Sequence, residues 1–258
     1  MSAGAPLRAL IFDVDGTLAE TERDGHRIAF NEAFTQAGLP WRWDVPTYGH
    51  WLRVAGGRER LRAFIETCAD APTGAAARDA LAAQLHRLKN AAYVALVAAG
   101  TLRARPGVQR LLDECRTQGV RVAIATTTGR GNVEALFPHL FGARWREWFT
   151  VLLCAEDAPR KKPDPQVYAL ALQRLNVAAV SAIAIEDSPA GLAAARAAGL
   201  RCLITRSTYF HDADFPGASA VVDDLDASPP WPAAGATHCD LQALRALVQV
   251  APLRTSYG

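Results

Sequence analysis

The sequence predicts an α/β fold in which a block of helices is inserted into a parallel sheet after its first strand. Two observations predict it. From residue 106 onward, short apolar runs alternate with helical segments, which is the pattern of a parallel sheet with right-handed crossovers. Between residues 20 and 100, by contrast, the chain has no strong strand run. We therefore expect a split α/β core over 1–19 and 103–258 and an inserted helical domain over 20–102.

The N-terminal elements follow from apolar spacing. LRALIF, at residues 7–12, predicts the first strand. Helices are expected at 22–38, 57–69 and 76–99. The last helix is supported by apolar residues that recur at helical spacing, namely Leu81, Leu85, Leu88, Ala92 and Leu96. The polar and aromatic segment WRWDVPTYGHWLRV lies between the first two helices, and no element is predicted for it.

The C-terminal elements alternate strictly. The helix at 106–119 has Pro at its start and Gly at its end, as helices commonly do. Further helices are expected at 164–177 and 189–200, and a short amphipathic helix at 240–249, after a loop from Ser228. Strands are expected within GVRVAIATTT, WFTVLLCAED, VSAIAIEDS, RCLIT and, more weakly, ASAVVDD.

Composition excludes several classes of function. The 258 residues are half apolar and carry a net charge of +2, which provides no general field for nucleic acid. The apolar stretches are shorter than the roughly 20 residues that a bilayer span needs. An acidic pair comes too early for a signal peptide. Five scattered cysteines without a CxxC predict reduced thiols in a cytoplasmic protein. We expect no obligate protein partner.

The most informative motif directly follows the first strand. Asp13 and Asp15 stand at alternate positions, so their side chains can point the same way from the carboxyl end of the strand. Two carboxylates there suit Mg²⁺ and a phosphoryl group. A strand followed by a plain Asp-Gly turn has the same letters, so this motif alone leaves both interpretations open.

The string DVDGTL, from Asp13 to Leu18, resembles the first motif of the haloacid dehalogenase (HAD) superfamily. The resemblance implies a Rossmann-like core with an α-helical cap. It also implies that Asp13 is a nucleophile that forms an aspartyl-phosphate. Asp15 would be the general acid and base, and its backbone carbonyl would bind Mg²⁺. Because dehalogenases lack the second Asp, Asp15 argues against that branch.

Three further HAD motifs occur in the expected order. Thr126 ends the strand VRVAIA and would hold phosphoryl oxygens. Lys162, in KKPDP, would neutralise the transferring phosphate and the crowded carboxylates. Glu186 and Asp187 follow the strand AIAI and would join the two aspartates of the first motif around Mg²⁺. Four motifs in order, each near the end of a predicted strand, make coincidence a poor explanation.

The inserted domain resembles the CbbY-type group of the superfamily in strings such as DVDGTLAETE, AFNEAF, GGRERL and HRLKNAAYVAL. This resemblance implies a phosphatase for xylulose 1,5-bisphosphate, a Rubisco inhibitor of the Calvin cycle. Cations of the cap taken singly suit a solvated surface, but together they suggest a receptor for a second phosphate. The predicted substrate contacts are Glu22, Gly56, Gly57, Arg58, Glu59, Arg60, His86, Lys89, Thr127, Thr128, Arg130 and Asn132.

One position departs from the family pattern. Related sequences commonly carry the first histidine of the cap twelve residues after the nucleophile. Gly25 occupies that position here, and His26 comes one residue later. The shift argues against a role for His26.

Other activities remain open at this level. A β-phosphoglucomutase-like mutase needs the same core and a cap cation such as Lys89. A phosphoglycolate or general sugar-phosphate phosphatase shares all four motifs. A binding protein with a HAD fold is disfavoured by the intact Asp13, Asp15, Lys162 and Asp187.

Overall fold

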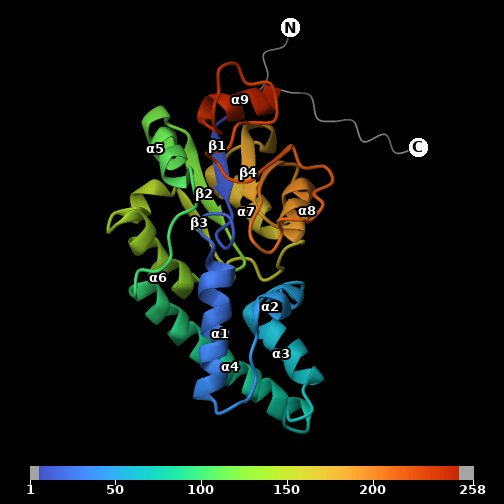
Figure 1. The fold of residues 1–258 in the computed structure, drawn as a ribbon. Helices are drawn as coiled ribbons and strands as arrows, with labels where there is room; N and C mark the ends of the chain where they lie inside the picture. Colours follow the sequence, from blue (N-terminus) through green and yellow to red (C-terminus); the bar gives the residue numbers. More distant parts are fainter. Residues whose placement is uncertain (1–5, 250–258) are drawn as a thin grey trace, which may run out of the picture.

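A single parallel sheet forms the centre of the protein, as the alternating pattern predicts (Figure 1). The computed structural model describes residues 6–249, so the outermost ends of the predicted core lie outside the described residues. The strands are β1 (Ala9–Phe12), β2 (Arg121–Ala125), β3 (Val151–Leu153), β4 (Ala182–Glu186), β5 (Arg201–Thr205) and β6 (Ala220–Val222), in the order β3-β2-β1-β4-β5-β6. This order places the end of β1, where the first motif begins, between the ends of β2 and β4.

Both faces of the sheet are covered by helices. Leu10 and Phe12 of β1 belong to one buried cluster with residues of α5 (Val108–Gln118) and α6 (Arg130–Phe141). Ala9 and Ile11 belong to a second cluster with residues of α7 (Gln166–Leu175) and α8 (Pro189–Ala197). Burial on both faces explains why these strands read as continuous apolar runs rather than as alternating ones.

The inserted block has a hydrophobic core of its own. It contains a π-helical turn (Glu22–His26), α1 (Arg27–Gln36), α2 (Val45–Trp51), α3 (Gly57–Thr67) and α4 (Ala75–Ala98). Phe34, Trp43 and Leu61 are fully buried in a cluster that belongs to these helices. In Figure 1 the four α-helices lie below the sheet, and α9 (Leu241–Gln249) lies at the opposite end of the molecule. A separate core supports the proposal that residues 20–102 form a cap.

Two α-helices of the described residues were not predicted, nor were the short 3₁₀ helices Trp145–Trp148 and Ala179–Ser181. One is α2, within the polar and aromatic segment. The Asp44 carboxylate caps it by accepting a hydrogen bond from the Thr47 amide at 2.7 Å, and Pro46 stands in its first turn. Both are standard signals of a helix start. The other is α6, which follows the TTT run directly. In addition, the helix expected at 22–38 begins as a π-helical turn.

The cysteines and the helix lengths bear on the expectations from composition. All five cysteines are free thiols, and Cys154 and Cys202 are buried in the core. Within residues 6–249, no helix has the length and apolarity that crossing a bilayer requires.

Candidate active site

The four predicted motifs meet at the carboxyl edge of the sheet. Lys162, in the loop before α7, donates hydrogen bonds of 2.6 Å to Asp13 Oδ1 and to Glu186 Oε1. Carboxylate oxygens of Asp13, Glu186 and Asp187 all lie within 4.8 Å of one another, and the three residues are buried. Thr126 lines a small cavity of about 100 Å³ together with Asp13, Asp15, Lys162 and Asp187. Sequence-distant residues thus converge because β1, β2 and β4 are neighbours.

Both carboxylate oxygens of Glu186 accept hydrogen bonds. Its Oε1 accepts from Lys162 and, at 2.6 Å, from the Tyr168 hydroxyl. Its Oε2 accepts from the Asp187 amide at 3.2 Å and from Ser188 Oγ at 3.3 Å. A Cβ on Gly191 would lie only 1.9 Å from Glu186 Cδ, so the first turn of α8 closes against the carboxylate. Glu186 therefore orients Lys162 toward Asp13.

The carboxylates of this cluster outnumber its one ammonium group. Burial raises the pKa of Asp13 to about 8, although Lys162 opposes the shift. Burial, followed by the charges of Asp13 and Glu186, also raises the pKa of Asp187 well above its ordinary value. Three buried carboxylates share one ammonium, an arrangement that is costly unless a further positive charge compensates it. Clustered carboxylate oxygens are the donors that Mg²⁺ prefers, so these residues fit the ion.

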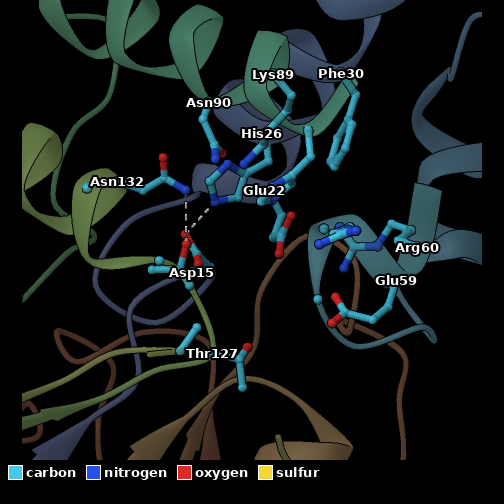
Figure 2. A pocket seen from close by; sticks show the side chains of 18 of the residues that line it. Asp15, Glu22, His26, Phe30, Glu59, Arg60, Lys89, Asn90, Thr127 and Asn132 are labelled. Carbon is cyan, nitrogen blue, oxygen red and sulfur yellow. Dashed lines mark hydrogen bonds and ion pairs between the residues drawn. The ribbon is translucent and has the colours of Figure 1, made fainter. Parts of the chain in front are cut away.

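Asp15 faces a different environment from Asp13. Its Oδ1 accepts a hydrogen bond of 2.5 Å from the Thr21 hydroxyl and one of 3.0 Å from His26 Nε2. Burial raises the pKa of Asp15, but the His26 charge and these hydrogen bonds outweigh it and bring the pKa down to about 2. The two carboxylates of the first motif therefore differ in their partners: Asp13 accepts from Lys162, and Asp15 lies against His26 of the inserted block (Figure 2).

The one-residue shift in sequence argues against a role for His26, but the structure places its imidazole 3.0 Å from Asp15 Oδ1. The Arg27 amide donates to the Glu22 carbonyl, five residues back, which is the hydrogen bond of a π-turn. This turn accommodates one more residue than an α-turn, so the one-residue shift in sequence is absorbed and the imidazole reaches Asp15. The Tyr93 ring stacks on His26 with the ring centres 4.3 Å apart. A residue count from Asp13 missed this contact because the count does not reveal the π-turn.

A larger cavity of about 590 Å³ lies between the inserted helices and the core. Figure 2 shows its side chains converging from both parts: Asp15 and Thr127 from the core, and His26, Glu59 and Lys89 from the insertion. The predicted substrate contacts that line it are Glu22, Gly56, Gly57, Arg58, Glu59, Arg60, His86, Lys89, Thr127, Thr128 and Asn132.

Arg130 is the exception among the predicted substrate contacts. It does not line this cavity, and its guanidinium pairs with the Asp157 carboxylate at 2.5 Å. Arg130 is the first residue of α6, and its backbone amide donates to the Glu156 carboxylate. Arg130 therefore contacts acidic residues of the core and does not reach the cavity surface.

Cations inside the cavity lie against rings and neutral groups. Lys89 Nζ lies 5.4 Å from the ring centre of Phe30 and 5.2 Å from that of Tyr93. Arg60 donates to the Tyr48 hydroxyl at 2.9 Å, and Tyr48 in turn donates to Glu22. Burial lowers the pKa of Lys89 to about 8 and that of His86 to about 4. An incoming anion would stabilise the charged forms of both groups.

Two residues that line the large cavity, and one that lies behind the phosphoryl site, were not predicted. Asn90 directly follows Lys89 on α4, and Lys161 directly precedes Lys162. Tyr168, which holds Glu186, stands in the string KKPDPQVY. Each has a neighbour in a recognised motif, which is the signal that could have found it.

The chain matches the family described as haloacid dehalogenase-like hydrolase over residues 7–199. It is 45% identical over 222 residues to protein CbbY of Rhodobacter capsulatus, covering 86% of this chain and 95% of that protein. It is also 44% identical over 246 residues to protein CbbY of Cupriavidus necator, covering 93% of this chain and 96% of that protein. The chain is a CbbY-family haloacid dehalogenase-like hydrolase.

Solved structures of CbbY extend the comparison. A mutant of CbbY from Rhodobacter sphaeroides in complex with xylulose 1,5-bisphosphate superimposes with a TM-score of 0.78 at 42% identity, covering 84% of this chain and 94% of that one. A β-phosphoglucomutase-like structure from Thermotoga maritima matches at 24% identity with a TM-score of 0.61, which shows the shared fold alone. The predicted HAD core with a helical region after β1 is thereby confirmed, and the protein is a phosphatase of this family.

Proposed function

We propose that this CbbY-family phosphatase hydrolyses one phosphate ester of a sugar bisphosphate, xylulose 1,5-bisphosphate, in a Mg²⁺-dependent reaction. The observation that carries the proposal is the adjacency of two cavities. The small one contains Asp13 and Lys162, and the large one contains the cap cations. Five residues line both: Asp15, Glu22, Gly56, Arg60 and Thr127. One ligand with phosphates at its two ends suits such a pair of connected sites.

The chain's own residues supply the reaction steps. The Asp13 carboxylate attacks phosphorus and forms an aspartyl-phosphate. Asp15 passes a proton to the leaving sugar oxygen and then takes one from the attacking water. The negative charge of the bound phosphate raises the pKa of Asp15 and so favours the protonated form that the first transfer needs. His26 and Thr21 hold the Asp15 carboxylate in place for both transfers. Lys162 and Thr126 stabilise the phosphoryl oxygens.

Mg²⁺ would be held by Asp13, Glu186, Asp187 and the Asp15 carbonyl, and would neutralise charge on the phosphoryl group. The buried carboxylate cluster supports this set. The backbone oxygen of Asp15 is included because the family resemblance implies it, while the Asp15 carboxylate accepts from His26 and Thr21.

The distal phosphate would bind among Arg58, Arg60, His86 and Lys89, all of which line the large cavity. The CbbY structure with xylulose 1,5-bisphosphate supports this substrate. The proposal includes a cytoplasmic location and the removal of a Rubisco inhibitor in the Calvin cycle.

A phosphate-release screen over sugar mono- and bisphosphates with Mg²⁺ tests the proposal. We expect kcat/KM for xylulose 1,5-bisphosphate to exceed that for every monophosphate, and Asp13→Asn to lower kcat by more than about 1,000-fold. Isomerisation of glucose 1-phosphate would favour a mutase instead. Activity on phosphoglycolate without activity on pentulose bisphosphates would favour the general phosphatase.

A further inference from the structure

An ion pair links the two walls of the large cavity. Lys161, in the core loop that carries Lys162, lies 2.7 Å from Glu59 on α3 of the cap. Both side chains line the cavity. Side-chain exposure is 23% for Lys161 and 50% for Glu59, so the pair is reached by solvent and is not part of a buried core. Partly exposed pairs of this kind are weak.

The pair lies against the backbone of Gly56, which lines both cavities. Gly56 has a φ of +91°, and a Cβ there would fall 2.2 Å from both Glu59 Oε2 and Lys161 Nζ. A side chain at this position would displace the two charged groups from where they lie. The ion pair therefore lies at the junction between the phosphoryl site and the cap cations.

Glu59 differs from the other carboxylates of the large cavity. Asp15 is held by His26, and Glu22 accepts from the Tyr48 hydroxyl. Glu156 accepts from the Arg130 amide at the start of α6. Glu59 instead pairs with a flexible lysine and is half exposed. Among the acids that line the described cavity, it is the one whose partner an incoming anion can take.

We propose that Lys161 is a specificity residue for the distal phosphate of the substrate, and that Glu59 holds Lys161 until that phosphate displaces it. This inference rests on the proposed sugar-bisphosphatase function. A phosphate dianion carries more charge than one carboxylate and can share Lys161 with Arg58 and His86, which line the same cavity. A monophosphate leaves the Glu59–Lys161 pair in place. Lys161 thus favours bisphosphates over monophosphates.

The test compares two substrates in Lys161→Met and wild type. The substrates are xylulose 1,5-bisphosphate and p-nitrophenyl phosphate, which has no distal phosphate. We expect Lys161→Met to raise KM for the bisphosphate about 10- to 100-fold, with most of the loss in KM rather than kcat. The ratio of kcat/KM for the bisphosphate to that for p-nitrophenyl phosphate falls accordingly, and Lys161→Arg restores most of it.

Glu59→Gln gives the opposite expectation. Without the competing carboxylate, Lys161 is free for phosphate, so the same ratio rises about two- to tenfold. Arg160→Met is the matched control, because Arg160 is in the same loop, is 67% exposed and pairs with Asp164 outside both cavities. It leaves the ratio unchanged.

An unchanged ratio in Lys161→Met, or an equal fall in kcat on both substrates, would overturn the inference, since the latter would mean that Lys161 acts through Lys162. A lower ratio in Glu59→Gln would also overturn it. The proposed function is judged separately, by whether the wild-type enzyme releases phosphate from the bisphosphate at all.

Discussion

At the scale of single residues, the site depends on how each buried polar group is paired. Glu186 is fully buried and accepts four hydrogen bonds, one of them from the Tyr168 hydroxyl. Hydrogen bonds to a buried charge are worth more than neutral ones. The phenol of Tyr168 therefore contributes to the fold as well as to the orientation of the carboxylate.

Tyr168→Phe is expected to lower the free energy of unfolding by about 1.5–3 kcal/mol, because it removes a hydrogen bond to a charged group. Urea unfolding with Mg²⁺ absent measures it. Tyr93→Phe is the matched control: that hydroxyl is buried and has no hydrogen-bond partner within residues 6–249, so its loss breaks no hydrogen bond and does not destabilise the protein. Equal effects in the two variants would contradict the prediction.

At the scale of elements, helix starts meet strand ends at close range. Ser188 caps α8 by accepting from the Gly191 amide at 3.0 Å, and its hydroxyl also donates to Glu186 at the end of β4. This double contact brings the first turn of α8 against the carboxylate. Gly191 is the residue that makes the approach sterically feasible.

Gly191→Ala is expected to destabilise the protein by more than about 2 kcal/mol and to reduce activity, because the new methyl group displaces a fully bonded carboxylate. Gly131→Ala provides the comparison. Gly131 is also helical, but a Cβ there has nothing within 4 Å, so this change stabilises by about 0.5–1 kcal/mol. Thermal unfolding of both variants decides. A Gly191→Ala protein as stable as wild type would refute the packing argument.

At the scale of the whole molecule, the sheet order assembles more negative than positive charge at one point. Asp13 follows β1, and Glu186 and Asp187 come from the end of β4 and the position after it, while Lys162 arrives from the loop before α7. Because burial raises the pKa of Asp13 from 3.8 to about 8, the metal-free fold binds a proton that the unfolded chain releases. Protonated Asp13 therefore contributes to the free energy of unfolding at low pH, and this contribution is lost as pH rises from about 4 to about 8.

Mg²⁺ should reverse this loss, since it binds the deprotonated carboxylates. We expect Mg²⁺ to stabilise the protein more at pH 8.5 than at pH 6. Where free Mg²⁺ is 100-fold above Kd, the gain is about 2.7 kcal/mol. Urea unfolding at both pH values measures it. Asp187→Asn abolishes most of the gain, whereas the surface variant Asp113→Asn keeps it. A gain independent of pH would contradict the assignment of Asp13 to the metal.

Local patterns in the sequence were enough to predict the six strands, most helices and the four core motifs. Each strand reads as an apolar run because both sheet faces are covered. Three of the four motifs lie at a strand end, and Lys162 lies in the loop before α7. The helix α2 was missed although Asp44 and Pro46 are local signals of its start, because its seven residues are too few to show a helical periodicity of apolar residues. The proposed contact at Arg130 was not brought to the cavity because Asp157 binds its guanidinium.

The sequence by itself determined the family, the parallel α/β core, and the carboxylates and lysine of the phosphoryl site. These features depend on apolar runs and on motif residues that are close together along the chain. Only the tertiary structure decided which groups meet across the cavity. It brought His26 to Asp15 through a π-turn, Tyr168 to Glu186, and Lys161 to Glu59. These contacts join residues on separate elements, so they depend on how the elements pack and not on the spacing of residues along the chain.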